Sequence, residues 1–239
     1  MTNNFILVIP ARLNSTRLPK KLLISIEGKS IIERTYNCAL KALGEKDRII
    51  IATDSNEIKY HCEKFGARVI MTSENCLTGT DRIAEVAEKV EADQYINLQG
   101  DEPIFPTNEL NFFIKEVSKN LSDVHTAITK IKNESDFRNL SIPKMVFTNS
   151  KKLLYSSRAP IPASKSDVFG NAYKHVCIYA FNKKHLEIFH RQNQKSIFEL
   201  QEDLEINRFL ELDINVRCVE LIKSGKAVDN IHDLEIVRE

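Results

Sequence analysis

Apolar runs and amphipathic segments alternate along the first half of the chain. Phe5–Ile9 is an unbroken apolar run, which is typical of a strand buried on both faces of a sheet. Residues 30–43 carry apolar side chains at helical spacing, and Gly44 is placed to end that helix. The same patterns predict further strands over Arg48–Thr53, Ala67–Met71 and Gln94–Leu98. Helices are predicted between and after them, over Asn56–Phe65, 83–90 and 110–117. Strands separated by single helices predict parallel βαβ units with right-handed crossovers.

The alternation weakens after residue 120. Strands are predicted over Val124–Lys130, Lys144–Thr148 and His175–Asn182, without helices of similar length between them, and residues 160–172 have the prolines and small polar residues of a loop. A helix over 197–212, a strand over Val216–Ile222 and a helix from about residue 230 follow. We therefore expect one α/β domain over residues 1–239. It would hold a Rossmann-like, mainly parallel sheet flanked by helices, with a smaller β-rich excursion at about 124–182.

Composition narrows the possible partners and the compartment. Lys and Arg total 34 against 33 Asp and Glu, so bulk electrostatic binding to nucleic acid or to anionic lipid is not expected. The apolar run at Phe5–Ile9 is too short to cross a bilayer, and no signal-peptide pattern surrounds it. The five cysteines have no CxxC spacing, which favours reduced thiols in a cytoplasmic protein over disulfides or a metal cluster.

A basic segment follows the first predicted strand. Residues 10–21 place Arg12, Arg17, Lys20 and Lys21 in the loop that leaves this strand, at the carboxyl edge of the sheet. Ligands of open α/β sheets bind at that edge, and these cations suit a triphosphate. The loop lacks the glycines of a Walker motif. A solvated basic loop is the alternative interpretation.

Two carboxylates are candidates for binding Mg²⁺. Asp101 lies in Gln99-Gly100-Asp101-Glu102-Pro103, directly after the predicted strand Gln94–Leu98, and Asp229 follows the last predicted strand. Mg²⁺ is commonly held by one or two carboxylates together with phosphate oxygens and water. A turn at Asp101 and a helix N-cap at Asp229 are the alternative interpretations.

Two further groups of polar residues have helical or strand spacing. His175 and Tyr179 are four residues apart on a predicted strand, so both side chains should point to one face. Glu202, Glu205 and Arg208 recur at three-residue intervals in the predicted helix 197–212. A packed strand face and a solvated helix face with an internal ion pair are the alternatives to a binding role.

These motifs occur together in one order, and the chain resembles the 3-deoxy-manno-octulosonate (Kdo) cytidylyltransferase family, also called CMP-Kdo synthetases, from about residue 5 to the end. The resemblance rests on eight segments: Pro10-Ala11-Arg12 through Lys21, Ala52-Thr53-Asp54, Met71-Thr72-Ser73 through Gly79-Thr80-Asp81-Arg82, Gln99 to Pro103, Tyr155 to Pro162, His175 through Ile178-Tyr179, Leu204-Glu205 through Arg208, and Val228-Asp229 through Asp233-Leu234-Glu235.

The resemblance implies a dimeric fold of the nucleotide-diphospho-sugar transferase kind, with CTP as donor, Mg²⁺ as cofactor and the acidic sugar Kdo as acceptor on the route to lipopolysaccharide. By position, it implies catalytic roles for Arg12, Arg17, Lys21 and Asp101, and metal binding by Asp101 and Asp229. The nucleotide would contact Ala11, Arg12, Lys21, Thr78, Gly79, Arg82 and Gln99. The acceptor would contact Arg158, His175, Tyr179 and Glu205. The excursion at about 124–182 would contribute to the acceptor site and to the dimer contact.

Three positions depart from the family pattern. Lys20 replaces a usual Gly and is expected to add charge beside the phosphates, Ile206 replaces a Gln, and Asn230-Ile231-His232 replaces Thr-Pro-Glu. The Ile206 departure leaves open a different acidic sugar, such as 8-amino-Kdo or a nonulosonic acid. A glycosyltransferase that consumes a nucleotide sugar is a more distant alternative, although such a donor needs fewer cations than a triphosphate.

Overall fold

The computed structural model describes residues 4–15 and 18–238, apart from the side chain of His232. Its strands are β1 (Phe5–Ala11), β2 (Ser25–Ile26), β3 (Lys29–Ser30), β4 (Ile49–Thr53), β5 (Arg68–Met71), β6 (Gln94–Leu98), β7 (Val124–Lys130), β8 (Lys144–Phe147), β9 (Leu153–Ser157), β10 (Tyr173–Phe181) and β11 (Val216–Glu220). Its α-helices are α1 (Ile31–Leu43), α2 (Asn56–Glu63), α3 (Gly79–Lys89), α4 (Thr107–Val117), α5 (Glu134–Arg138), α6 (Lys183–His190), α7 (Ile197–Glu202), α8 (Ile206–Glu211) and α9 (Ile231–Arg238). Short 3₁₀ turns, η1 (Lys21–Leu23) and η2 (Lys46–Arg48), complete the elements.

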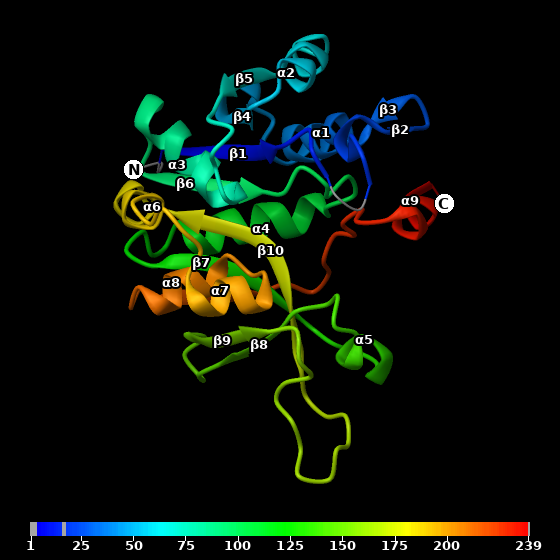
Figure 1. Ribbon diagram of the computed structural model, residues 1–239, viewed down its shortest axis with the longest axis vertical. Coiled ribbons are helices and arrows are strands. Elements are labelled where there is room, and N and C mark those ends of the chain that lie inside the picture. Colours follow the sequence, from blue (N-terminus) through cyan, green and yellow to red (C-terminus); the bar gives the residue numbers. More distant parts are fainter. Residues whose placement is uncertain (1–3, 16–17, 239) are drawn as a thin grey trace.

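The main sheet confirms the predicted α/β class. Its strands run in the order β11-β7-β10-β6-β1-β4-β5, and β8 and β9 extend it as a hairpin beside β10. All neighbouring pairs along that path are parallel except those that β10 makes with β6 and β7. Figure 1 shows the β8–β9 hairpin and the loop over residues 158–172 extending away from the body of the sheet.

The central strand β1 is buried on both faces, as its apolar run predicts. Leu7 and Ile9 join a core with α1, α2, α4 and α9, whereas Ile6 and Val8 join a second core with α3, α6 and α8. The two cores exist because successive side chains of a strand point to opposite faces. The helices therefore cover both faces and leave the strand ends available for a site.

Local capping residues set the helix boundaries. The Ser30 side chain accepts a hydrogen bond from the Glu33 backbone at the start of α1, and Gly44, at φ 68°, ends this helix. At the start of α3, Thr78 and Asp81 form a reciprocal capping box. Such signals lie within a few residues of each other, so these boundaries agree with the sequence pattern.

The predicted long helix over 197–212 is wrong. Two short helices, α7 and α8, occupy this stretch, and Asp203 between them adopts a left-handed backbone at φ 51°. Arg208 is fully buried and pairs with Glu199 instead of lying on a solvated face. Glu199 and Arg208 would lie about 13 Å apart along a continuous helix, so the ion pair can form only because the helix is interrupted.

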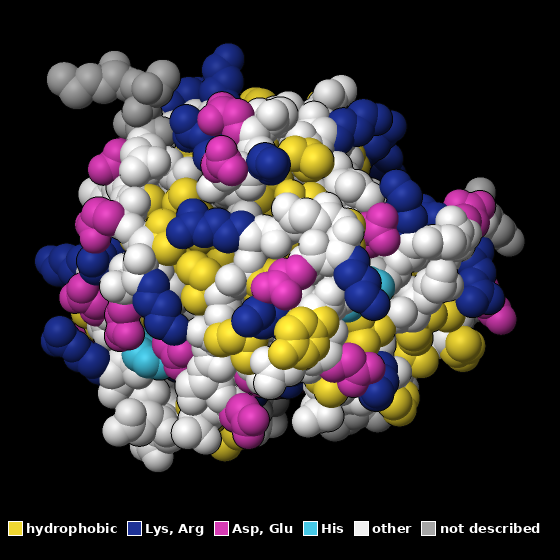
Figure 2. All heavy atoms as spheres, turned by 90° about the horizontal axis from the view of Figure 1, so that it is seen from above, with side chains coloured by type: hydrophobic (Ala, Val, Ile, Leu, Met, Phe, Trp, Pro, Cys, Tyr) yellow, Lys and Arg dark blue, Asp and Glu magenta, His cyan; other side chains and the backbone are white. Residues whose placement is uncertain are grey.

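Charged residues are mixed over the surface seen in Figure 2, where Lys and Arg lie among Asp and Glu without one dominant basic area. This distribution fits the formal net charge of +1. Among the described residues, no helix combines the length and the apolar character that a membrane span requires.

Stability should fall in mild acid partly because of His125. This side chain is buried on β7, and burial lowers its pKa from 6.5 to about 4; the charge of Asp123 opposes this shift and that of Arg217 adds to it. Between pH 6.5 and 4 the unfolded chain binds a proton that the native imidazole does not, so acid favours unfolding. We expect His125 to account for a loss of about 2–3 kcal/mol between pH 7 and 4.5. Urea titrations at both pH values should show a smaller loss for His125→Asn, and equal losses in both proteins would contradict this.

Candidate active site

The carboxyl ends of β1 and β6 approach each other closely. A Cβ atom on Gly100 would lie 2.8 Å from the carbonyl oxygen of Pro10, which is closer than real Cβ contacts, so the backbones can meet only because this residue is glycine. On the other side, a Cβ on Gly79 would lie 3.2 Å from the Pro10 ring and 3.6 Å from the Gln99 amide. Three motifs that are distant in sequence are thus brought to one edge of the sheet.

A lysine and two carboxylates form the centre of this edge. Lys21 Nζ lies 2.5 Å from Asp101 Oδ2 and 3.2 Å from Asp229 Oδ1. The Val228 backbone N–H donates to the Asp101 carbonyl at 2.9 Å, which holds the two carboxylate-bearing segments side by side. Asp229 is not the cap of α9: the Asn230 side chain accepts from Asp233 N at 3.0 Å and takes that position.

This pair of carboxylates fits Mg²⁺. Both aspartates converge on one cationic group, and both keep part of their side chains exposed to ligand. Within the described part of the chain, no group of three or more His, Cys, Asp or Glu side chains forms a complete metal site. Two carboxylates supplemented by phosphate oxygens and water are the usual environment of Mg²⁺.

The neighbouring Glu102 adds no full charge to this centre at neutral pH. Its side chain is buried, and Oε2 has no hydrogen-bond partner among the described residues. Burial raises the pKa of Glu102 to about 8, and the negative charge of Asp101 adds to the shift. The carboxyl is therefore largely protonated at pH 7.

The cations of the basic loop differ in their partners. Arg12 is exposed and makes no hydrogen bond or ion pair with any residue that the structure describes, so it is available to an anion. Arg17 lies outside the described residues. Lys20, expected beside the phosphates, instead binds Glu57 of α2 at 2.8 and 2.9 Å. Its φ of 51° is in the left-handed region that favours glycine.

The predicted nucleotide-contacting residues surround the meeting point of β1, β6 and α3. Ala11 ends β1, and Thr78 and Gly79 begin α3. Arg82 is buried: it pairs with Asp54 and donates to Thr72 Oγ1 at 2.7 Å, which fixes the loop before α3 to the end of β4. Arg82 therefore supports this group of residues, which we call the nucleotide wall, from inside the protein.

Three of the predicted acceptor residues form a polar cluster on the face of the sheet covered by α3 and α8. His175 and Tyr179 point to the same side of β10, as their spacing predicts, with ring centroids 5.5 Å apart. Glu205 accepts from Thr80 N at 3.2 Å and from Gln99 Nε2 at 3.5 Å, so it joins this cluster to the nucleotide wall. Burial lowers the pKa of His175 to about 3, so its imidazole is neutral at physiological pH.

Arg158, the fourth acceptor residue, anchors the end of α7. Its guanidinium donates to the carbonyls of Glu202, Asp203 and Leu140 at 2.6, 3.3 and 3.3 Å, which uses part of its five N–H donors. The pKa of Asp203 is lowered first by a hydrogen bond from Lys195 and then by the charges of Arg158 and Arg12. The charges of Arg158, which is predicted to bind the acceptor, and of Arg12 in the basic loop therefore both act on Asp203.

Cys177 lies among the candidate site residues, although the sequence analysis did not select it. Burial raises the pKa of its thiol, and the charges of Glu102, Glu205 and Asp101 add to the shift, which places the thiol among the site carboxyls. Its sulfur lies 3.9 Å from His175 Nδ1. The alternation of His175, Cys177 and Tyr179 along β10 was the available signal. Ile206, in contrast, is fully buried in the apolar core.

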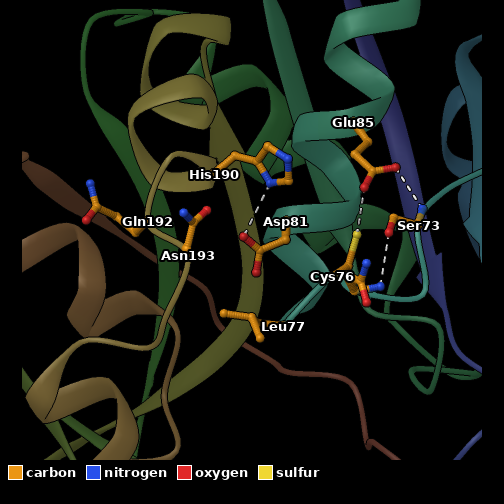
Figure 3. Close-up of a pocket in the computed structure, with 9 residues that line it drawn as sticks. Ser73, Cys76, Leu77, Asp81, Glu85, His190, Gln192 and Asn193 are labelled. Carbon is orange, nitrogen blue, oxygen red and sulfur yellow. Dashed lines mark hydrogen bonds and ion pairs between the residues drawn. The ribbon is translucent and has the colours of Figure 1, made fainter.

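A half-open pocket of about 290 Å³ lies elsewhere, between the loop before α3 and the segment after α6 (Figure 3). Its acidic side chains already have partners within the protein: Glu85 accepts from Ser73 N at 2.8 Å and contacts the Cys76 thiol at 3.2 Å, and Asp81 faces His190. None of the predicted site residues lines it. We infer that these contacts hold the loop that leads to Thr78 in place.

Comparisons with known proteins agree with this geometry. The family model described as Cytidylyltransferase matches residues 6–216. A 3-deoxy-manno-octulosonate cytidylyltransferase of Chlorobium phaeobacteroides is 38% identical over 98% of this chain and 96% of its own length. One of Protochlamydia amoebophila is 36% identical over 100% of this chain and 95% of its own.

Solved structures show the same fold. A CMP:2-keto-3-deoxy-manno-octonic acid synthetase complexed with CTP superposes with a TM-score of 0.90, at 35% identity over 98% of this chain and 97% of that one. A Bacillus anthracis protein described as a putative glucose-1-phosphate thymidylyltransferase, at 14% identity and a TM-score of 0.68, shares the fold alone. With most of its length matched by the family model and by these relatives, the chain belongs to the cytidylyltransferase family.

Proposed function

We propose that this protein transfers the cytidylyl group of CTP to the anomeric hydroxyl of Kdo and releases pyrophosphate, a step that would supply lipopolysaccharide biosynthesis. The observation that carries the proposal is the cluster of Lys21, Asp101 and Asp229 at the carboxyl edge of the sheet. It lies in a fold that matches a CTP-bound synthetase of this sugar at a TM-score of 0.90.

The reaction would be an in-line displacement at the α-phosphorus. A bond forms between the sugar oxygen and this phosphorus, the bond to the bridging oxygen of pyrophosphate breaks, and the hydroxyl proton is released. Arg12, Arg17 and Lys21 would neutralise the triphosphate and the departing pyrophosphate. Asp101 and Asp229 would hold Mg²⁺, which when bound offsets phosphate charge and lowers the pKa of the hydroxyl.

The acceptor would lie against the His175–Tyr179–Glu205 cluster. With His175 neutral, the sugar carboxylate needs a permanent cation, and the remaining donors of Arg158 would supply it. His175 would then donate to or accept from a sugar hydroxyl. The acceptor would then lie beside the α-phosphorus, opposite the departing pyrophosphate, as in-line attack requires.

The decisive experiment measures pyrophosphate release with CTP and a panel of acceptors: Kdo, 8-amino-Kdo, N-acetylneuraminate and glucose 1-phosphate. We expect the highest kcat/KM with Kdo. A clear preference for another acidic sugar would refute Kdo as the acceptor but would leave the proposed cytidylyl transfer intact. Release only with glucose 1-phosphate would refute both the acidic acceptor and attack by an anomeric hydroxyl, because the attacking oxygen would then belong to a phosphate group.

Arg158→Lys should raise KM for the acceptor and leave KM for CTP unchanged. The ammonium keeps the charge but loses the planar fork, at a cost of about 1–3 kcal/mol, or roughly 5- to 150-fold. Initial-rate kinetics with each substrate varied in turn checks this. Arg138→Lys on α5 is the matched control, because Arg138 pairs only with Glu134 and Asp167 away from the cluster. An equal rise in both KM values would point to general misfolding instead.

We further propose that the chain works as one domain and forms a homodimer in a reducing cytoplasm, a compartment that suits its five free thiols. Helix α7 exposes large apolar side chains: Ile197, Phe198 and Leu200 are 77%, 50% and 67% exposed. Phe198 also contacts Tyr155 of β9, so this exposed patch adjoins the β8–β9 hairpin. Such a patch is typical of an interface, and here it would be formed by the β8–β9 excursion together with α7.

Phe198→Glu should therefore convert the dimer to a monomer in sedimentation velocity. The charge would be buried at the centre of the proposed interface without a partner. Tyr60→Glu, an equally drastic change at an exposed site on α2, should leave the dimer intact. A monomeric wild type, or a dimer that tolerates the Phe198→Glu substitution, would exclude this interface.

A further inference from the structure

The ammonium of Lys21 occupies the point where the two metal-binding candidates converge. It contacts an oxygen of Asp101 at 2.5 Å and one of Asp229 at 3.2 Å, and its side chain is only 11% exposed. The two carboxylates come from positions 80 and 208 residues away in sequence. One cation is thus shared by the two carboxylates.

Lys21 is well fixed in this position. It begins the 3₁₀ turn η1, and its backbone N–H donates to the Leu18 carbonyl at 3.1 Å while its own carbonyl accepts from Ile24 at 3.1 Å. The adjacent Lys20 points the other way, to Glu57 on α2. The direction of the Lys21 side chain is therefore built into the loop and does not result from a general attraction of all nearby lysines.

A divalent cation that binds the same carboxylate oxygens must compete with this ammonium. The two positive charges would lie within a few ångströms of each other and repel strongly in a partly buried site. A triphosphate changes the balance, because it offers Lys21 a new anionic partner and offers the metal additional oxygen ligands. The carboxylates are then released to the metal.

We propose that Lys21 is an internal counter-ion that keeps divalent cations off Asp101 and Asp229 until a triphosphate draws its ammonium away. Metal and nucleotide then bind as a coupled pair, and neither carboxylate is left without a counter-charge at any stage. The role of the triphosphate in this inference rests on the proposed function, whereas the competition between Lys21 and a metal does not.

The test measures binding of Mn²⁺ alone, by the electron paramagnetic resonance signal of the free ion, in the absence of nucleotide and sugar. We expect weak binding to the wild type and at least tenfold tighter binding to Lys21→Gln, which loses the charge but can still donate a hydrogen bond. Lys21→Arg keeps a cation and should bind Mn²⁺ as weakly as the wild type. Adding Asp229→Asn to Lys21→Gln should abolish the gain, which would locate it at this site.

Lys20→Gln is the matched control, since it removes the neighbouring charge without touching either aspartate, and its Mn²⁺ affinity should not change. Circular dichroism and thermal unfolding establish that each variant is folded; should Lys21→Gln fail to fold, Lys21→Met provides the neutral side chain. Equal Mn²⁺ affinity in the wild type and in the neutral variants would overturn the proposal. The readout involves no turnover, so it is independent of whether Kdo proves to be the acceptor.

Discussion

Asp101→Asn is expected to lower kcat at least 100-fold. The substitution keeps the size and shape of the side chain but removes a negative charge from the centre formed with Lys21 and Asp229. Loss of one preorganised electrostatic group in an active site commonly costs a factor of about 100 to 1,000 in turnover. Here Asp101 would also be a ligand of the catalytic metal, which adds to the loss. Steady-state pyrophosphate release with saturating CTP and Kdo measures the effect.

Two further variants separate a catalytic effect from a structural one. Asp47→Asn changes an exposed aspartate of η2 and should retain the wild-type rate. Asp229→Asn should resemble Asp101→Asn, and the double variant should be little worse than either single one, because residues that act as a unit are not additive. Near-normal turnover in Asp101→Asn would remove this residue from the mechanism.

The largest effect on stability is expected from Glu199→Gln. Arg208 is fully buried, and Glu199 binds its Nε at 2.5 Å and its Nη2 at 2.6 Å, while the Phe189 ring lies 3.8 Å from the guanidinium carbon. Without the Glu199 charge, the closest remaining carboxylate contact of the buried cation is the longer one to Asp81, at 3.4 Å. Breaking a buried pair from one side typically costs about 3–5 kcal/mol. Urea unfolding at pH 7 measures the free energy.

A double replacement provides the sharpest control. Glu199→Leu combined with Arg208→Met removes both charges at similar volume and should recover much of the lost stability, since apolar substitutes for a buried pair are often neutral. Glu134→Gln breaks an exposed ion pair with Arg138 and should have no measurable effect. If Glu199→Gln proved as stable as the wild type, Arg208 could not be the desolvated charge that the structure shows.

The Glu199–Arg208 pair also connects stability with the site. Arg208 reaches Asp81, which closes the capping box with Thr78 at the start of α3. Glu205, three residues before Arg208, binds Thr80 in the same turn. Helices α7 and α8 are therefore tied to the wall of the nucleotide site, so a variant that loosens the pair should weaken CTP binding as well.

The sequence by itself determined most strands of the main sheet, although not β9, and the edge at which the chemistry would be found. Buried parallel strands need apolar side chains on both faces, and helix ends need capping groups a few residues away, so Phe5–Ile9, Ser30 and Gly44 could be interpreted locally. The motifs around Lys21, Asp101 and Asp229 could likewise be placed after strands. Which charges would meet could not be determined from those patterns.

Only the tertiary structure decided the pairing of charges. Lys20 and Lys21 are adjacent in sequence, yet one binds Glu57 and the other Asp101 and Asp229, because the left-handed backbone at Lys20 turns the two side chains apart. Glu202, Glu205 and Arg208 share a helical spacing, yet the helix is interrupted at Asp203, and they bind three different partners: Arg158, Thr80 and Glu199. The periodicity of a sequence indicates which face of a helix or strand is apolar. The partner of a charged side chain depends instead on strand order and on contacts between residues as much as 208 positions apart.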